Sequence, residues 1–151
     1  MYVKDFLSKK AIEPKLKART KEGVLEELTS LLERTGKLTD KEEFLKVIKE
    51  REELGSTGIG DNVAIPHARS SGVKSLIGAI GISEKGIDFD ALDKEPAHLF
   101  FMLGAPKNAA GDYLKALATV SRFLRHRKYH QFLLEAKTLE DVLEIVEKEI
   151  I

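Results

Sequence analysis

Three short apolar runs occupy the middle of the chain, and segments with helical periodicity lie on both sides of them. The runs cover residues 63–65, 76–82 and 98–103, with Pro66 after the first, glycines within the second and Gly104 after the third. Consecutive apolar residues over so short a length are typical of strands that are buried on both faces. Such a sheet needs helices against each face, so the sequence predicts an α/β sandwich. Because 151 residues suit one domain, we expect a single domain over residues 1–151.

Apolar residues at helical spacing predict the flanking helices. These run from Thr20 to Gly36, from Thr39 past Arg51, from about Ala109 to Leu124, from Lys128 to Leu134 and from Thr138 onward. Thr20 is the expected N-cap of the first helix, and Thr39 that of the second because Glu42 follows at capping-box spacing. In the third helix the residues expected to face the core are Leu114, Leu117, Ala118, Ser121 and Leu124.

Arg51 stands out in the second helix because it shares a face with apolar residues. It lies two turns after Phe44, on the face that also carries Val47 and Ile48. One interpretation is that the arginine points into a cleft, toward an anion. The other is that it closes the last turn of its helix against exposed carbonyl groups. The spacing alone leaves both open.

Composition excludes several classes of function. Lys plus Arg and Asp plus Glu both number 25, so the chain has no excess positive charge for binding nucleic acid or an anionic membrane. The absence of cysteine excludes disulfides, thiolate metal sites and cysteine nucleophiles. No apolar stretch has the length of a membrane span and the first residues lack a signal-peptide core, so we expect a cytoplasmic protein without membrane insertion.

A glycine-rich loop leads into the first apolar run, which ends at Pro66-His67. The loop contains Gly55, Ser56, Thr57, Gly58 and Gly60. Its N–H groups and two hydroxyl groups, together with Arg51, are possible donors for an anion. Neutral imidazole is a competent nucleophile near pH 7, and phosphoryl transfer needs little beyond positioning and such donors. The alternatives are that the loop is a plain turn and that His67 is structural.

The other histidines do not form a convincing metal site. His126 and His130 have i, i+4 spacing, but they lie in a basic segment and are interpreted as solvated surface. His98 opens an apolar run and is interpreted as structural. We therefore expect neither a metal nor a cofactor.

Two segments resemble a known active-site signature: residues 51–60, Arg-Glu-Glu-Leu-Gly-Ser-Thr-Gly-Ile-Gly, and residues 63–69, Val-Ala-Ile-Pro-His-Ala-Arg. It is that of the mannitol/fructose class of enzyme IIA domains of the bacterial phosphoenolpyruvate-dependent sugar phosphotransferase system, which includes nitrogen-regulatory enzyme IIA proteins. The resemblance continues in residues 88–93 and 99–106 and covers nearly the whole chain. It implies a mixed β-sheet flanked by helices on both faces.

The resemblance also assigns roles. It implies that His67 accepts a phosphoryl group on Nε2 from the histidine-containing phosphocarrier protein and passes it to a cysteine of a IIB domain, or holds it as a signal. Arg51 matches the active-site arginine of the family. Many members carry a second histidine where this chain has Tyr113, whose hydroxyl can donate one hydrogen bond but does not become cationic at neutral pH.

Three functions follow from these expectations. The first is a phosphocarrier that serves a fructose- or mannitol-like IIB partner. The second is a stand-alone regulatory protein whose phosphorylation state controls binding to its targets, which the lack of a fused IIB or IIC segment in this sequence favours slightly. The third is a protein that kept the fold and lost the transfer activity.

Overall fold

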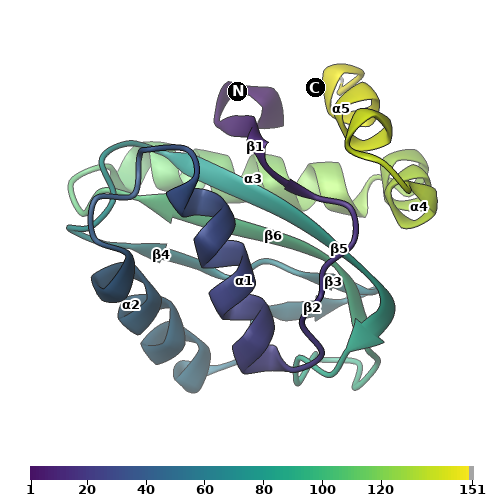
Figure 1. The fold of residues 1–151 in the computed structure, drawn as a ribbon, viewed down its shortest axis with the longest axis horizontal. Helices are drawn as coiled ribbons and strands as arrows, with labels where there is room; N and C mark the ends of the chain where they lie inside the picture. Colours follow the sequence, from purple (N-terminus) through teal and green to yellow (C-terminus); the bar gives the residue numbers. More distant parts are fainter. Residues whose placement is uncertain (150–151) are drawn as a thin grey trace.

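The computed structural model describes residues 1–149 and contains one six-stranded sheet with helices on both faces (Figure 1). The strands are β1 (Leu7–Glu13), β2 (Gly58–Gly60), β3 (Val63–Ala64), β4 (His67–Arg69), β5 (Ile77–Ile87) and β6 (Ala97–Ala105). The helices are a short 3-10 turn at Val3–Asp5, α1 (Lys21–Glu33), α2 (Lys41–Leu54), α3 (Ala110–Arg125), α4 (Arg127–Glu135) and α5 (Leu139–Glu147).

The sheet is mixed, as expected. Its order is β1-β5-β6-β3-β2, and β4 also pairs with β6. The central strands β5 and β6 are antiparallel, whereas β1 is parallel to β5, and both β3 and β4 are parallel to β6. Since β3 and β4 follow one another along the same side of β6, Pro66 lies between them and His67 starts the second short strand.

Side chains that alternate along the strands pack into two separate hydrophobic cores, one on each face of the sheet. On β6, Leu99, Phe101 and Leu103 pack with α3, α4 and α5, whereas Phe100 and Met102 pack with α1 and α2. Figure 1 shows the same division, with α1 and α2 in front of the sheet and α3 behind it. The predicted α/β sandwich with helices on both faces is therefore confirmed. Two-sided burial also explains why these strands carry consecutive apolar residues.

The first two helices form largely as their sequences predict. Thr20 caps α1 by accepting a hydrogen bond from the Gly23 N–H at 3.0 Å. The five apolar residues of this helix at helical spacing are all buried: Val24, Leu25, Leu28, Leu31 and Leu32. The prediction that Thr39 caps α2 is wrong by one residue, because the Asp40 carboxylate accepts from the Glu43 N–H at 3.0 Å instead.

The predicted inward face of α3 is right only in part, because Leu124 is buried and Leu117 packs against the core, whereas Ala118 is exposed. Leu114 is 65% exposed, and the buried residues are Ala116, Thr119, Val120, Phe123 and Leu124. The buried face of α3 is rotated from the predicted one. In its first turn, which lies along the rim of the site described below, Tyr113 and not Leu114 faces inward. Leu114 fits the helical spacing of apolar residues although its side chain is exposed. Spacing alone does not show which of two adjacent faces of the helix packs against the sheet.

Glycine at position 104 brings α2 close to the sheet. A Cβ atom there would lie 2.9 Å from the Phe44 ring, so a side chain at this position would push the helix away. Gly104 pairs with Ala68, the neighbour of His67. The close contact at Phe44 therefore brings the helix face that carries Arg51, two turns further on, next to β4.

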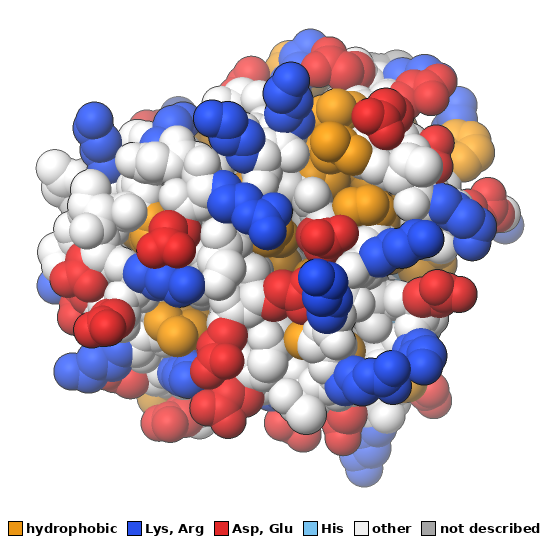
Figure 2. All heavy atoms as spheres, in the orientation of Figure 1, with side chains coloured by type: hydrophobic (Ala, Val, Ile, Leu, Met, Phe, Trp, Pro, Cys, Tyr) orange, Lys and Arg blue, Asp and Glu red, His pale blue; other side chains and the backbone are white. Residues whose placement is uncertain are grey.

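Acidic and basic side chains are interspersed over the face that α1 and α2 cover (Figure 2). No helix within residues 1–149 is long and apolar enough to cross a membrane.

Candidate functional site

A hollow of about 460 Å³ lies where the end of α2, the strand β4 and the first turn of α3 meet. Seven residues line it: Val47, Arg51, His67, Ala68, Arg69, Lys107 and Tyr113. The structure therefore brings together three residues that the sequence analysis singled out, from positions 51, 67 and 113. Among residues 1–149 this lining contains three cationic side chains and no carboxylate.

The tautomer of His67 follows from one hydrogen bond. Its Nδ1 lies 2.6 Å from the Ile65 carbonyl oxygen. A carbonyl oxygen only accepts hydrogen bonds, so in the neutral ring Nδ1 carries the proton and donates it. The other nitrogen, Nε2, is then left with its lone pair, which is the form a nucleophile requires.

The surroundings of His67 favour this neutral form. Burial of the half-buried ring is the largest effect, and it lowers the pKa from the ordinary value of 6.5. The Ile65 hydrogen bond and the negative charge of Glu52 oppose that shift, and the positive charge of Arg51 adds to it. Since the pKa lies below 6.5, the imidazole is uncharged at pH 7 and Nε2 is available.

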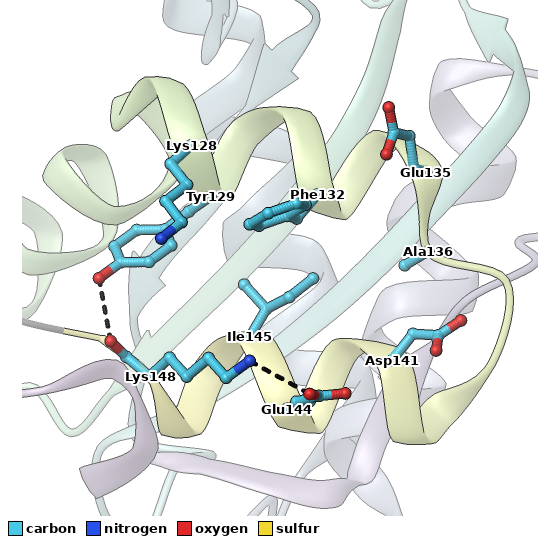
Figure 3. Close-up of a pocket in the computed structure, with 9 residues that line it drawn as sticks. All are labelled: Lys128, Tyr129, Phe132, Glu135, Ala136, Asp141, Glu144, Ile145 and Lys148. Atoms are coloured by element: carbon cyan, nitrogen blue, oxygen red, sulfur yellow. Dashed lines mark hydrogen bonds and ion pairs between the residues drawn. The ribbon is translucent and has the colours of Figure 1, made fainter.

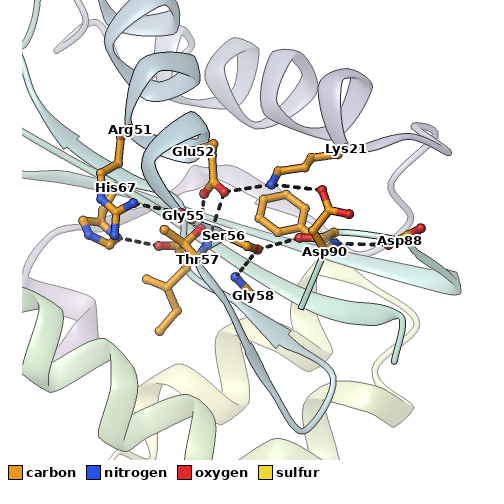
Figure 4. Close-up of polar contacts among 12 residues, drawn as sticks. Lys21, Arg51, Glu52, Gly55, Ser56, Thr57, Gly58, His67, Asp88 and Asp90 are labelled. Carbon is orange, nitrogen blue, oxygen red and sulfur yellow. Dashed lines mark hydrogen bonds and ion pairs between the residues drawn. The ribbon is translucent and has the colours of Figure 1, made fainter. Parts of the chain in front are cut away.

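Arg51 reaches the hollow from the last turn of α2. Its Nη1 donates a hydrogen bond to the Gly55 carbonyl oxygen at 2.9 Å. Figure 4 shows the guanidinium group beside the His67 ring. Both interpretations left open by the spacing therefore hold at once, because the arginine closes the end of its helix and also lines the cleft.

Two further cations line this hollow, and neither was predicted from the sequence as a site residue. Arg69 donates from Nη1 to the Lys107 carbonyl oxygen at 3.1 Å, and its guanidinium carbon lies 5.7 Å from the centre of the Tyr113 ring. A signal for Arg69 was present, since residues two apart on a strand share a face and His67 is two residues earlier. Lys107 follows the Gly-Ala-Pro turn and carried no comparable signal.

Tyr113 stands against His67 as expected from its place in the chain. The two ring centres are 6.0 Å apart, with an angle of 53° between the ring planes. Burial raises the pKa of the phenol above its ordinary value of 10.0, against the opposing effect of Arg51 and Arg69. Tyr113 therefore keeps its proton at neutral pH and can donate a hydrogen bond, without contributing charge.

The glycine-rich loop is arranged differently from the expected cradle of donors. The Ser56 hydroxyl donates to the Phe89 carbonyl oxygen at 2.6 Å and accepts from the Gly58 N–H at 3.0 Å. The Thr57 N–H and hydroxyl both donate to the Glu52 carboxylate. The Gly55 N–H donates to the Glu52 carbonyl oxygen at 3.2 Å. These donors are all used in hydrogen bonds within the protein. The loop residues therefore lie behind the hollow and are not among its lining residues.

Gly60 also lies in this supporting layer. It ends β2, which pairs with β3, and its α-carbon faces the Asp93 carboxylate. A Cβ atom at position 60 would lie 3.3 Å from that carboxylate, and the φ angle of +90° is one that side-chain-bearing residues rarely adopt. Ile59, between the two glycines, packs against the core on the α3 side.

The remaining histidines have structural surroundings. The His98 Nδ1 contacts the Ser83 carbonyl oxygen at 2.8 Å, and the His130 Nε2 contacts the Asp61 carbonyl oxygen at 2.6 Å. The His126 ring stacks on Tyr129, with 4.3 Å between ring centres. Within residues 1–149, no group of three or more histidine, aspartate or glutamate side chains is placed to hold a metal ion.

Comparison with known proteins adds a family to this geometry. Residues 5–149 match the family described as "Phosphoenolpyruvate-dependent sugar phosphotransferase system, EIIA 2". The fructose-specific EIIABC component of Bacillus subtilis is 36% identical over 97% of this chain, which spans only 23% of that relative's length. The fructose-specific EIIA component of Haloferax volcanii is 41% identical, over 85% of this chain and 86% of that protein.

A solved structure agrees with these relatives. The crystal structure of nitrogen regulatory protein IIA-Ntr from Neisseria meningitidis superposes with a TM-score of 0.85 at 32% identity. The superposition covers 94% of this chain and 97% of the other. Fructose-specific components of the phosphotransferase system and a nitrogen regulatory protein are thus both among the similar proteins.

Proposed function

Because the chain belongs to the EIIA 2 family of the phosphoenolpyruvate-dependent sugar phosphotransferase system, we propose that its His67 accepts and donates a phosphoryl group. The proposed donor is the phosphorylated histidine-containing phosphocarrier protein, and the proposed acceptor is a IIB domain of the fructose or mannitol type. The sugar itself does not contact this chain. No cofactor takes part in the proposed cycle.

The observation that carries this proposal is the fixed tautomer of His67 inside a cationic hollow. The Nδ1–H is committed to the Ile65 carbonyl oxygen at 2.6 Å, so the Nε2 lone pair is presented to a donor. Arg51, Arg69 and Lys107 surround the place where the negative phosphoryl oxygens would lie. Phosphoryl transfer is catalysed mainly by such positioning and charge stabilisation, with little covalent chemistry left for the protein.

The proposed transfer proceeds in line. A bond forms between Nε2 and phosphorus while the bond from phosphorus to the donor nitrogen breaks, and the electron pair of that bond stays on the donor nitrogen. A donor ring that is protonated on its other nitrogen leaves as neutral imidazole. The Nδ1 proton of His67 stays in place, so the phosphorylated ring becomes cationic and the Ile65 carbonyl oxygen stabilises that charge.

A regulatory role is the second candidate. Its support is the 32% identity to nitrogen regulatory protein IIA-Ntr over 94% of this chain. Tyr113 also supports it, because a neutral phenol beside His67 offers less charge to a departing phosphoryl group than a second imidazole does. In this role the phosphorylated and unphosphorylated forms of the hollow bind different regulatory targets. The retention of the fold without transfer activity is the third alternative.

Labelling tests the proposal directly. Incubation with phosphoenolpyruvate, enzyme I and the phosphocarrier protein should add about 80 Da to the protein, in an acid-labile linkage. The His67→Ala variant should gain no mass. A matched control is His98→Gln, because His98 also directs its Nδ1 at a carbonyl oxygen but does not line the hollow.

The two variants separate the possible outcomes. Labelling of wild type and His98→Gln but not of His67→Ala is the expected result. Labelling of His67→Ala at the wild-type rate contradicts the proposed phosphoacceptor, and no labelling of the wild type favours the loss of activity. Subsequent addition of a fructose-type IIB domain separates the first two roles, since a carrier loses its phosphoryl group to IIB within seconds to minutes and a purely regulatory protein retains it.

A further inference from the structure

Glu52 is a buried carboxylate that the transfer itself does not use. The residue is 7% exposed and lies on the turn of α2 directly after Arg51. Burying a carboxylate is costly unless donors surround it. Its position beside a site that needs positive charge therefore requires an explanation, because an uncompensated acid there would weaken the attraction for a phosphoryl group.

Donors on two sides satisfy this carboxylate. Thr57 donates to both carboxylate oxygens, from its N–H to Oε2 at 3.1 Å and from its hydroxyl group to Oε1 through a short hydrogen bond. The carboxylate also pairs with Lys21, whose Nζ lies 3.1 Å from Oε2. Figure 4 shows this arrangement, in which Glu52 lies between Thr57 and Lys21 and points away from His67.

Lys21 is itself held by several contacts. Its Nζ lies 4.7 Å from the centre of the Phe89 ring and 3.6 Å from the Asp90 carboxylate. It starts α1, so the Glu52 pair connects the beginning of one helix to the end of another. Lys21 therefore matches the negative charge of Glu52 behind the hollow, whose described lining contains three cations and no carboxylate.

The contacts of Glu52 also fix the turn that holds Arg51. The main chain leaves α2 at Gly55, whose N–H donates to the Glu52 carbonyl oxygen and whose carbonyl oxygen accepts from Arg51 at 2.9 Å. Thr57, two residues later, is tied to the Glu52 side chain. Glu52 is thus hydrogen-bonded to the turn at Gly55 and at Thr57. The Gly55 carbonyl oxygen, which accepts from Arg51, lies between these two hydrogen bonds.

We propose that Glu52 is a positioning residue for phosphoryl transfer, which acts through Thr57 and the Gly55 carbonyl group to hold the Arg51 guanidinium beside His67. Glu52 does not touch the phosphoryl group. The proposal rests on the proposed function, since Arg51 matters in this way only if His67 exchanges a phosphoryl group.

A double-mutant cycle tests this coupling. The variant Glu52→Gln keeps the size of the side chain and removes its charge. It should lower the initial rate of His67 phosphorylation by about tenfold, less than the roughly hundredfold cost of moving a catalytic group by 1 Å, because Thr57 can still donate to the amide oxygen. In an Arg51→Ala background the same substitution should have almost no further effect, because Glu52 acts through Arg51. The rates are measured by mass spectrometry, with phosphorylated phosphocarrier protein in excess.

Glu53→Gln is the matched control. It makes the same chemical change one residue later, on an exposed position of the same helix, and it should leave the rate unchanged. Thr57→Val and Thr57→Ser form a second pair that leaves the carboxylate in place. Thr57→Val should slow phosphorylation as much as Glu52→Gln does. Thr57→Ser should keep a rate near that of the wild type, because it retains the hydroxyl group that donates to Glu52. This pair also serves if Glu52→Gln fails to fold.

The outcomes are distinct. A wild-type rate for Glu52→Gln, or an equal fold-reduction with and without Arg51, overturns the positioning role while leaving the phosphoacceptor intact. Equal rates for Thr57→Val and Thr57→Ser also overturn it. Absence of label on His67 in the wild type overturns the proposed function itself.

Discussion

Two of the hollows in residues 1–149 have similar sizes and very different chemistry. One is the site around His67, at about 460 Å³, and the other lies between α4 and α5, at about 550 Å³ (Figure 3). In the second hollow, Phe132 and Ile145 point toward one another, and Lys148 pairs with Glu144 at 3.1 Å. Asp141 accepts hydrogen bonds from the N–H groups of residues 137 and 138.

The difference shows that volume does not identify the functional site. The α4–α5 hollow is the larger, but its lining mixes both signs of charge and its polar groups bond to one another. The His67 hollow has three cations without carboxylates among the described lining residues, and a histidine whose tautomer is fixed. Unpaired positive charge beside a fixed nucleophile is what a phosphoryl group requires.

The largest expected effect that distinguishes the two hollows comes from removing one cation from each. Arg51→Ala should lower the rate of His67 phosphorylation by about a hundredfold, the loss typical of removing one donor to a developing charge. Lys128→Ala, which removes a lysine from the α4–α5 hollow, should leave that rate unchanged. Both rates come from the same labelling assay. Equal losses in the two variants would show that general surface charge, rather than the His67 hollow, governs the reaction.

A smaller effect concerns pH. Since burial lowers the pKa of His67 below 6.5, the fraction of neutral ring, and with it the phosphorylation rate, should fall to half of its maximum only below pH 6.5. Arg51→Ala should raise this pKa, because it removes a positive charge beside the ring. NMR titration of the ring measures both values. A wild-type pKa at or above 6.5 would contradict the environment described for the ring.

The smallest expected effect comes from Tyr113. Tyr113→Phe removes one neutral donor and keeps the ring beside His67, so the rate should decline by less than about tenfold. Tyr113→His should shorten the lifetime of the phosphohistidine, because a cationic ring can assist departure of the phosphoryl group. Decay of the acid-labile label measures this lifetime. If neither variant changes the rate or the lifetime, Tyr113 has no role in the transfer.

Much of the fold was predictable because short-range patterns dictate it. The face of α1 and the three apolar runs follow from the 3.6-residue period and from burial on both faces. Strand β1 was not predicted, since Leu7–Glu13 is half polar and becomes a strand by pairing with β5, about 70 residues away. Such long-range pairing leaves little local signal.

The site was predictable in part, because a short motif carries two of its main residues. His67, Arg51 and Tyr113 were identified from the motif and its resemblance, and the structure brings them to one hollow. The contacts of the loop were not predictable, because a glycine-rich sequence does not reveal which partners its N–H groups take. The pairing of Ser56 with Phe89 and of Thr57 with Glu52 depends on neighbouring segments that only the fold brings close.

The identity of the phosphorylated nitrogen tests the central proposal most directly. Long-range ¹H–¹⁵N NMR spectra of the phosphorylated protein distinguish the two ring nitrogens of His67. Since Nδ1 is committed to the Ile65 carbonyl oxygen, the phosphoryl group should be found on Nε2, with the proton retained on Nδ1. A phosphoryl group on Nδ1, or on any side chain other than His67, would contradict the proposal.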